Sequence, residues 1–363
     1  MAERPADPNA PRLLRRGRHA IRSLFTPLLP DDYLAMIDPL WSTDELRGRI
    51  ERITQEADDA VTVVIKPGWG WKGHKPGQYL RVGVIVDGIH YWRAYSLTSP
   101  PEADYVSIAP KTVPEGKVSP YLNEIANPGT LVRLGGVQGD FTLPDDPPEK
   151  VLMISAGSGI TPIMSMLRGL DAEGSVPDIV HLHSAGSRER VIFGDELEAL
   201  EDRYPSYSVH LHLTDQIKRI EPTDLEDLCP DWRERDTYAS GPGDLLDACS
   251  EHWEQDEGVD AERFNVERFQ KKLTESDGEG GTVKFLKSEV EASSDGTTPI
   301  LEVGENEGLN LDFGCREGIC HTCTCELVSG RVRDLTSGKV HGEEGATIRI
   351  CINAPEGPVE VNA

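Results

Sequence analysis

Residues Gly314 to Cys325 read Gly-Cys-Arg-Glu-Gly-Ile-Cys-His-Thr-Cys-Thr-Cys, and this stretch decides the fold around it. Its first three cysteines have the spacing C-x4-C-x2-C, and Cys351 follows in the segment Ile-Arg-Ile-Cys-Ile-Asn. Glycine permits positive φ angles and a close approach of the backbone, so Gly314 and Gly318 favour a loop that curls around a bound group. Three thiolates from one tight loop could then meet a fourth from a distant strand.

The order of these cysteines resembles the ligand order of plant-type [2Fe–2S] ferredoxins. A zinc site is the alternative, but zinc sites usually pair two short C-x2-4-C knuckles. Cys325 could compete with Cys351 as the fourth ligand, although its place on a predicted strand favours packing beside the cluster. The expected metal ligands are therefore Cys315, Cys320, Cys323 and Cys351.

The sequence around the cysteines predicts a small α+β domain over residues 282–363. Short β-rich runs flank the loop, and a helix is expected to begin at Pro299. With the cluster loop, this pattern resembles a β-grasp ferredoxin domain. Residues 263–281 end in Ser-Asp-Gly-Glu-Gly-Gly and are predicted to be a hydrophilic linker.

Residues 148–262 show a different period, in which predicted strands alternate with helices. A buried strand over Val151–Ser155 runs into Ala-Gly-Ser-Gly-Ile-Thr-Pro and then into an apolar helix. Further strands are expected at 179–183, 208–213 and 237–240. This alternation predicts a parallel α/β sheet that binds ligands at the carboxyl ends of its strands, where glycines let the backbone approach a phosphate.

Residues 45–147 contain short β-rich runs broken by glycine and proline, which predicts an antiparallel barrel. The runs are 61–65, 79–86, 91–97, 105–109 and 131–134. In the run Arg-Ala-Tyr-Ser-Leu, period-two alternation places Arg93, Tyr95 and Leu97 on one face and Ser96 on the other. Trp69, Trp71 and Trp92 are expected in the core of this domain, with shielding of a flavin as the alternative.

The Arg-x-Tyr-Ser motif resembles the flavin motif of the ferredoxin–NADP reductase superfamily. This resemblance implies a Greek-key barrel that binds FAD. In the family the tyrosine packs on the flavin ring, the serine hydrogen-bonds near its N5 atom, and the arginine pairs with the pyrophosphate. These roles fall on Tyr95, Ser96 and Arg93. They agree with an aromatic wall for a flat ring and a forked guanidinium for a diphosphate.

Three further motifs follow in family order. Gly-Lys-Val-Ser at 116–119 resembles the diphosphate turn, with a plain helix cap at Ser119 as the alternative. The glycine turn at 156–162 resembles the nicotinamide turn, and Ser240-Gly-Pro resembles the Cys-Gly-Pro loop, with serine where many relatives have cysteine. The residues that the resemblance assigns to cofactors are Arg93, Tyr95, Ser96, Leu97, Lys111, Gly116, Lys117, Val118, Ser119, Gly157, Ser158, Gly159, Thr161, Pro162, Ser184, Arg188, Arg190, Gly241 and Pro242, with catalytic roles for Tyr95, Ser96, Thr161 and Ser240.

The coenzyme is expected to be NADPH rather than NADH. Arg188 and Arg190, with Ser184 or Ser187, follow the second strand of the α/β domain, where dinucleotide domains discriminate the adenosine ribose. They could hold a 2′-phosphate. Alternatively, the arginines pair with neighbouring acidic residues on the surface. His181 and His183 alternate on the same strand and are expected to pack in the core.

Residues 1–30 are basic and amphipathic in an otherwise acidic chain. Five arginines lie among five apolar residues: Arg12, Arg15, Arg16, Arg18, Arg22, Leu13, Leu14, Ile21, Leu24 and Phe25. The stretch could lie on an anionic membrane surface or on a membrane-bound partner. A frayed terminus, or a helix on the protein's own acidic body, is the alternative. Residues 31–40 are predicted to form a helical bridge, so that 1–44 precede the barrel.

The composition narrows the class of protein. A formal charge of -26 over 363 residues argues against a nucleic-acid binder. No apolar run reaches the roughly 18 residues that a membrane helix needs. Seven cysteines and no predicted signal peptide favour a protein of the reducing cytoplasm. We expect at most a peripheral association of this protein with the membrane. A monomer is expected, and the acidic surface serves either partner steering or salt adaptation.

The three predicted cofactors imply an electron-transfer reductase. NAD(P)H delivers a hydride, a [2Fe–2S] cluster takes one electron at a time, and FAD can do both. The domain order resembles phthalate- and phenylacetate-type oxygenase reductases. The amino-terminal stretch and the cluster loop also resemble actinobacterial reductases of fatty-acid and acyl-CoA desaturases, and we expect a desaturase ahead of a soluble oxygenase. A different kind of protein is the alternative to an enzyme: a redox sensor or an electron-carrier subunit.

Overall fold

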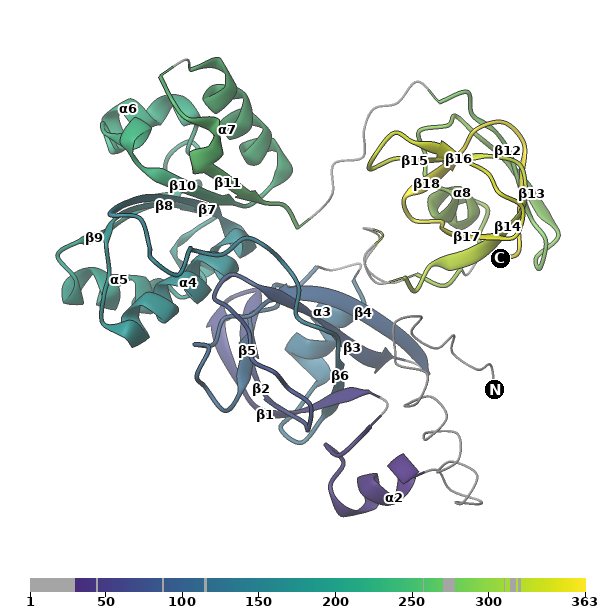
Figure 1. Cartoon of the computed structure of the whole chain (residues 1–363), viewed down its shortest axis with the longest axis horizontal. Helices are drawn as coiled ribbons and strands as arrows, with labels where there is room; N and C mark the ends of the chain where they lie inside the picture. Colours follow the sequence, from purple (N-terminus) through teal and green to yellow (C-terminus); the bar gives the residue numbers. More distant parts are fainter. Residues whose placement is uncertain are drawn as a thin grey trace.

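The computed structural model describes residues 30–363 except 44, 87, 114–115, 257, 270–277, 310, 314–317 and 319–320. Within this part, the strands form a six-stranded sheet, two five-stranded sheets and a three-stranded sheet. Figure 1 shows them as three bodies that follow one another along the chain. None of the helices in the described part is long and apolar enough to cross a bilayer. The basic stretch at 1–29 lies outside the described residues.

The first sheet is antiparallel, in the order β4-β3-β6-β1-β2-β5. The backbone N–H of Thr98 donates to the carbonyl of Ser107, 2.8 Å away, and so links the end of β4 to β5. The predicted antiparallel pairing is confirmed. Closure of the sheet into a Greek-key barrel remains a prediction. Its elements are β1 (Leu46–Ala57), β2 (Ala60–Pro67), β3 (Tyr79–Val86), β4 (Ile89–Ser96), β5 (Val106–Ile108), α3 (Val118–Pro120), the π-helical turn η1 (Tyr121–Ile125) and β6 (Leu131–Leu134), preceded by the helix α2 (Pro30–Ile37).

β1 is the longest strand of this sheet, and the sequence pattern did not predict it. It reads Leu-Arg-Gly-Arg-Ile-Glu-Arg-Ile-Thr-Gln-Glu-Ala, and only Gly48, Ile50 and Ala57 are buried. Charged and long polar residues are weak strand formers, so the local sequence does not indicate a strand here. Pairing with β2 and β6 on its two sides decides its conformation.

The second sheet is parallel, in the order β11-β10-β7-β8-β9. One buried cluster joins its first face to α4 and α5, and another joins the opposite face to α6 and α7. The parallel α/β prediction is confirmed. The elements are β7 (Lys150–Ala156), η2 (Gly157–Gly159), α4 (Ile160–Glu173), β8 (Asp178–Ala185), η3 (Arg188–Arg190), α5 (Gly194–Arg203), β9 (Tyr207–Leu213), η4 (Pro222–Asp224), α6 (Leu225–Leu228), η5 (Trp232–Glu234), β10 (Asp236–Ser240), α7 (Gly243–Gln255), η6 (Ala261–Arg263) and β11 (Phe264–Glu267).

β11 corrects the predicted linker at 263–281. Phe264–Glu267 pairs in parallel with β10, and its first and third residues pack against a buried cluster of the sheet. The apolar-polar alternation Phe-Asn-Val-Glu signalled a strand, but four residues in a charged context are a weak signal. The strand therefore belongs to the dinucleotide sheet rather than to a linker.

The carboxyl-terminal body contains a mixed five-stranded sheet, in the order β13-β12-β19-β14-β17, and a three-stranded sheet, in the order β16-β15-β18. Helix α8 packs with them in one buried cluster. Cys351 was expected on a strand, but it lies in a turn between β17 and β18. The elements are β12 (Gly281–Phe285), β13 (Val290–Ser294), α8 (Ile300–Asn306), β14 (Thr324–Ser329), β15 (Val332–Asp334), β16 (Val340–His341), β17 (Ala346–Arg349), β18 (Asn353–Pro355) and β19 (Val359–Val361).

Candidate functional site

Strand β4 carries the Arg-x-Tyr-Ser motif along the antiparallel sheet. Tyr95 is half-buried against the core of the sheet, and burial raises the pKa of its phenol, so it stays neutral. Ser96 is buried, and its hydroxyl has no hydrogen-bond partner among the described residues. Arg93 donates from Nη1 to the carbonyl of Trp92 at 3.3 Å and forms no ion pair with another described residue. A buried hydroxyl without a partner, a neutral phenol and a guanidinium without an ion pair among the described residues are groups that fit a flavin.

Leu97, the residue directly after β4, differs from the other predicted residues of the motif. Its side chain is fully buried in the core of the sheet, and its backbone N–H donates to the carbonyl of Gln78 at 2.8 Å. The Leu97 side chain therefore packs in the core, and the backbone carbonyl of Leu97 is the group that could contact a ligand.

The predicted diphosphate turn is closed by its own residues. The hydroxyl of Ser119 accepts from the backbone N–H of Val113 at 3.1 Å, and the N–H of Gly116 donates to the carbonyl of Val113 at 2.8 Å. Ser119 lies inside α3, and the residue before that helix, Lys117, makes no side-chain cap. The alternative of a helix cap at Ser119 is thus wrong. Val118 is buried in the core of the sheet.

The glycine turn lies where β7 runs into η2 and α4. Gly157 has a φ of +54°, which favours glycine. A Cβ on Gly159 would collide with the carbonyl oxygen of Ser240, so this glycine lets the two strand ends meet. Thr161 donates from Oγ1 to the carbonyl of Ser158 at 2.9 Å. The turn therefore presents backbone at the carboxyl edge of the sheet, as phosphate-binding turns do.

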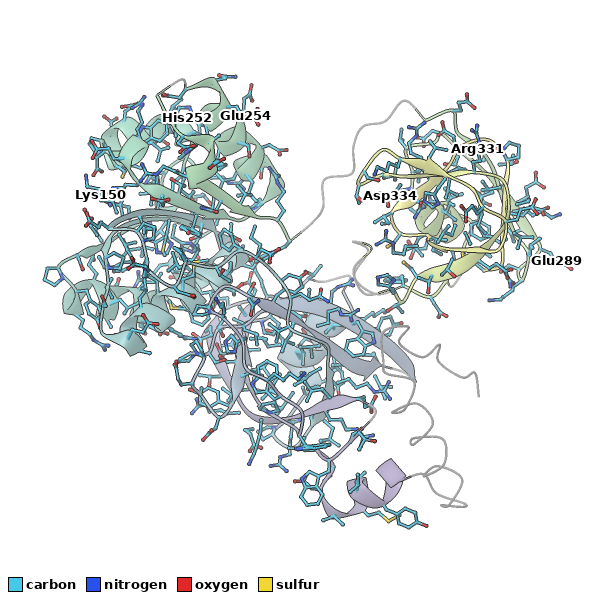
Figure 2. All side chains as sticks on the ribbon, in the orientation of Figure 1. Lys150, His252, Glu254, Glu289, Arg331 and Asp334 are labelled. Atoms are coloured by element: carbon cyan, nitrogen blue, oxygen red, sulfur yellow. The ribbon has the colours of Figure 1, made fainter. Side chains whose placement is uncertain are left out.

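Lys111 reaches this turn from the antiparallel sheet. Its ammonium nitrogen lies 3.9 Å from the place that a Cβ on Gly157 would take, and 3.4 Å from Oδ2 of Asp59. A cation held by a carboxylate thus lies beside the glycine turn. Lys150, labelled in Figure 2, marks the opposite end of β7, where it pairs with Asp231 and Glu234.

A row of polar side chains crosses the carboxyl edge of the parallel sheet. Glu267, Ser240, Ser155 and His183 are register partners on four neighbouring strands, so their side chains share one face. The hydroxyl of Ser240 and Oε2 of Glu267 are buried without a hydrogen-bond partner among the described residues. Burial raises the pKa of Glu267 to about 8, so this carboxyl is largely protonated at neutral pH. The motifs missed Glu267 because it lies in the predicted linker.

The histidines of β8 belong to the same edge. The hydroxyl of Ser155 lies 2.8 Å from Nε2 of His181 and 2.7 Å from Nδ1 of His183, and Nδ1 of His181 lies 2.9 Å from the hydroxyl of Tyr207. Burial lowers the pKa of both imidazoles, for His183 to about 4. The predicted burial is confirmed, but the side chains form a neutral hydrogen-bonded chain rather than apolar packing.

The loop after β8 holds the residues expected to select the coenzyme. Arg188 pairs with Glu198 at 2.6 Å and lies 4.0 Å from Asp195, which matches the surface-pairing alternative. Ser184 is buried, and its hydroxyl accepts weakly from the N–H of Ile220 at 3.5 Å. Arg190 is exposed and forms no ion pair with another described residue. Arg190 is therefore the cation of this loop that is available to a phosphate.

Two of the four predicted cluster ligands lie in the described part of the chain. The sulfur atoms of Cys323 and Cys351 are 3.0 Å apart in a buried position, although 28 residues separate them in sequence. Cys325 pairs in register with Ile348 on β17 and packs beside them. Cys315 and Cys320 lie outside the described residues. Two adjacent buried sulfurs fit a thiolate-held cluster.

The glycine expected to shape the cluster loop has a tight environment. Gly318 has a φ of +72°, and a Cβ there would collide with the side chain of Ile352. Its carbonyl accepts from Nη1 of Arg349 at 2.8 Å. The loop therefore requires glycine at this position.

Two aromatic rings bring the residue that precedes the cluster loop into contact with β4. Phe313 directly precedes the loop, and Tyr91 lies on β4 two residues before Arg93. Their ring centroids are 6.2 Å apart at an interplanar angle of 69°. A separate cleft of about 520 Å³ lies between β1, β2 and α4, and none of the predicted site residues lines it.

Comparison with known proteins gives a match for each body. Residues 72–143 match an oxidoreductase FAD-binding domain, residues 153–251 an oxidoreductase NAD-binding domain, and residues 283–356 a 2Fe-2S iron-sulfur cluster binding domain. The chain is 44% identical over 350 residues to an NADPH oxidoreductase of Mycobacterium tuberculosis, covering 94% of this chain and 91% of that protein.

More distant relatives share the same organisation. A glycine betaine monooxygenase reductase subunit of Pseudomonas aeruginosa is 30% identical over 318 residues, covering 79% of this chain and 87% of the relative. Phthalate dioxygenase reductase superposes with a TM-score of 0.61 at 21% identity, covering 88% of this chain and 98% of that structure, which shows a shared fold. The chain thus belongs to the family of ferredoxin-reductase-type oxidoreductases that combine FAD, NAD(P)H and a [2Fe–2S] cluster in one polypeptide.

Proposed function

We propose that this oxidoreductase takes electrons from NADPH and delivers them to a separate membrane fatty-acid or acyl-CoA desaturase. FAD, when bound, would supply the exchange between a two-electron hydride donor and a one-electron cluster. The observation that carries the reductase part of the proposal is the polar row beside the glycine turn, which Lys111 reaches from the antiparallel sheet. The protein groups there would bind and orient the cofactors, and some of them would hold protons.

In this proposal the antiparallel sheet holds the flavin. Ser96 satisfies its buried hydroxyl on the flavin ring, Tyr95 packs against the ring as a neutral phenol, and Arg93 pairs with the diphosphate. Lys111 supplies a further cation beside the glycine turn. Because the hydroxyl of Ser119 accepts from the N–H of Val113, its own O–H stays available to donate to a diphosphate oxygen beside the backbone N–H groups of the turn.

The parallel sheet holds the nicotinamide in the same proposal. Gly157 and Gly159 let the backbone approach, and Ser240 orients the ring with its unsatisfied hydroxyl. Glu267, which retains its proton at neutral pH, can donate a hydrogen bond beside Ser240. The serine thus acts with a carboxylic acid at a position where many relatives use a thiol.

NADPH is proposed as the coenzyme because Arg190 is exposed and unpaired within the described residues. The name of the relative at 44% identity, NADPH oxidoreductase, supports it. Replacing Arg190 with serine should raise the KM for NADPH about tenfold, equivalent to 1.4 kcal/mol, and leave the KM for NADH unchanged. Equal KM changes for the two coenzymes would show that Arg190 does not bind the 2′-phosphate.

The choice of acceptor rests on two observations that point in different directions. The basic stretch at 1–30 favours a membrane desaturase. The names of several relatives, among them the reductase component of a 3-ketosteroid-9-alpha-monooxygenase of Mycobacterium tuberculosis, favour a soluble oxygenase. An oxygenase acceptor is therefore the second candidate.

Reconstitution decides between these acceptors. Deletion of residues 1–30 should weaken coupling to a purified membrane desaturase while sparing the reduction of cytochrome c. Unchanged coupling after the deletion would remove the anchoring argument for a desaturase. An anaerobic titration, in which NADPH bleaches the flavin and cluster absorption within one turnover, separates a reductase from a redox sensor, which would stay oxidised.

A further inference from the structure

One arginine of the ferredoxin body joins the cluster loop to a carboxylate. Arg349, the last residue of β17, donates from Nη1 to the carbonyl of Gly318 at 2.8 Å and from Nη2 to Oδ2 of Asp334 at 3.4 Å. Gly318 lies between the predicted ligands Cys315 and Cys320 in sequence. Asp334, labelled in Figure 2, ends β15. The guanidinium therefore ties the loop of the expected cluster to the three-stranded sheet.

The backbone around Arg349 contacts the segments of the other two predicted ligands. The N–H of Ile350 donates to the carbonyl of Cys323 at 3.2 Å. The N–H of Ile352 donates to the carbonyl of Arg349 at 3.1 Å, which closes the turn that carries Cys351. Since the sulfur atoms of Cys323 and Cys351 are 3.0 Å apart, the backbone that places these sulfurs also fixes the position of the arginine.

Asp334 is held by its own turn as well as by the arginine. Its Oδ1 atom accepts from the N–H of Thr336 at 2.9 Å, from the hydroxyl of Thr336 at 2.6 Å and from the N–H of Ser337 at 3.0 Å. Burial favours the neutral acid, but these hydrogen bonds outweigh it and lower the pKa of Asp334 from its ordinary value. The group is therefore a carboxylate at neutral pH, and its Oδ2 atom contacts Arg349.

The two charges of this pair have unequal contact with the cluster loop. Reduction adds one negative charge to a [2Fe–2S] cluster, and the potential of such a cluster depends on nearby charge and hydrogen bonding. The guanidinium bonds the loop directly, whereas the carboxylate bonds the guanidinium. The side chains of Arg349 and Asp334 are 33% and 12% exposed, so water screens their charges only in part. The arginine should therefore favour the added electron, and the aspartate should oppose it.

We infer that Arg349 is a positioning residue of the cluster loop that raises the reduction potential of the cluster, and that Asp334 moderates this effect. The guanidinium holds the carbonyl of Gly318 in one orientation, and groups that orient ligands in this way tune a metal centre. A purely structural tie would give both members of the pair effects of one sign, because the loss of either would loosen the loop. The inference rests on the iron–sulfur domain and is independent of the acceptor.

An anaerobic redox titration of the full chain with its cofactors tests the inference. The electron paramagnetic resonance signal of the reduced cluster is recorded against the applied potential. Arg349→Gln should shift the one-electron equilibrium about tenfold toward the oxidised cluster, which corresponds to about 59 mV. Asp334→Asn should shift it about threefold in the opposite direction, because the variant keeps the Oδ1 acceptor but loses the negative charge.

Two further variants sharpen the test. Arg349→Lys keeps the charge but loses the fork that reaches both partners, so its shift should have the sign of the glutamine variant and a smaller size. Arg333→Gln is the matched control, because Arg333 also joins a carboxylate to a glycine: it pairs with Glu356 and donates from Nη1 to the carbonyl of Gly338 at 3.2 Å. Gly338 lies between β15 and β16 rather than in the cluster loop, so this variant should keep the potential of the unmodified chain.

The signs of the shifts decide the outcome. An unchanged potential in Arg349→Gln would overturn the inference. Shifts of the same sign in Arg349→Gln and Asp334→Asn would also overturn it, since they would show that the pair is only a structural tie. If the glutamine variant holds no cluster, Arg349→Lys and Asp334→Asn still give the two signs. Failure of the unmodified chain to pass electrons from NADPH to cytochrome c would instead overturn the proposed function, and the cluster potentials would remain measurable.

Discussion

The antiparallel sheet contacts its two neighbours in contrasting ways. Toward the parallel sheet it shares one hydrophobic core, in which Ala57, Ala60, Ala109 and Phe141 pack with side chains of β7 and α4. Hydrogen bonds cross the same seam, from the N–H of Gly77 to the hydroxyl of Ser165 at 3.0 Å and from Arg168 to the carbonyl of Thr98 at 2.6 Å.

Toward the ferredoxin body the contact has another character. The core of that body draws all its members from residues 283–363, and the aromatic pair of Tyr91 and Phe313 bridges the two bodies. Hydride transfer requires reacting atoms held about 3 to 3.5 Å apart, whereas a single electron depends less on alignment. In the proposed function, the seam with the shared core would hold the groups that exchange a hydride, and the contact with the ferredoxin body would carry single electrons.

The largest effect is expected where the rigid seam meets the glycine turn. Gly159→Ala would drive a methyl group into the carbonyl of Ser240, with a strain of about 1–3 kcal/mol, and a displaced turn should slow hydride transfer about 100-fold. The measurement is ferricyanide reduction by NADPH, together with thermal unfolding.

Gly136→Ala is the matched control for this change. A Cβ at Gly136 meets no atom within 4 Å, so that variant should behave like the unmodified chain. A fully active Gly159→Ala variant would show that the turn does not position the nicotinamide.

Glu267→Gln tests the electrostatics of the polar row. The folded pKa is about 8 against an ordinary value of 4.5, so between these pH values the unfolded chain releases a proton that the folded chain keeps. The stability of the unmodified protein should fall as pH rises through this window, by up to about 1.4 kcal/mol for each unit of pKa difference. The variant does not titrate there, so it should be the more stable protein at pH 8 and match the unmodified chain near pH 4.

Urea unfolding at pH 4.5, 6 and 8 checks this expectation. Parallel stability curves for the variant and the unmodified chain would mean that Glu267 is already ionised in the folded state. Glu234→Gln is the comparison, since Glu234 is an exposed carboxylate whose ion pair with Lys150 lies at the other end of β7.

Arg168 tests the strength of the seam itself. Its guanidinium makes two hydrogen bonds to Glu196, 2.8 and 2.6 Å long, and a third to the carbonyl of Thr98. Arg168→Ala should lower the free energy of unfolding by about 1–3 kcal/mol, because the buried carbonyl of Thr98 and the half-exposed carboxylate of Glu196 lose their donor. Arg203→Ala, which removes an exposed pair with Asp171, should cost less than about 1 kcal/mol. Equal losses in urea unfolding would indicate that Arg168 is only a surface pair.

Local chemistry explains which parts of this molecule the sequence could predict. The glycine turn, the Arg-x-Tyr-Ser strand and the cysteine spacing each occupy a few consecutive residues whose type is required by one contact. Positive φ at Gly157 and Gly318 is an example, because it depends only on the local chain. The parallel sheet followed from the alternation of strands and helices.

The remaining features depend on residues far apart in sequence. β1 is rich in charged and polar residues and becomes a strand between β2 and β6, while the weak alternation of β11 is decided by pairing with β10. Glu267 therefore joins the polar row through register with Ser240. Trp69, which was expected in the core, is 70% exposed.

The smallest effect is expected at the aromatic contact between Tyr91 on β4 and Phe313, which precedes the cluster loop. Such a pair is worth about 0.5–1.5 kcal/mol beyond its buried area, so Tyr91→Ala should lower the docked population, and with it cytochrome c reduction, about 2- to 10-fold. Ferricyanide reduction, which draws on the flavin, should not change, and Tyr91→Phe should restore the rate because the ring alone makes the contact. Small-angle scattering should show a larger radius of gyration for the alanine variant. If both reductions fall together, Tyr91 supports the flavin strand itself and the ferredoxin body is held by other contacts.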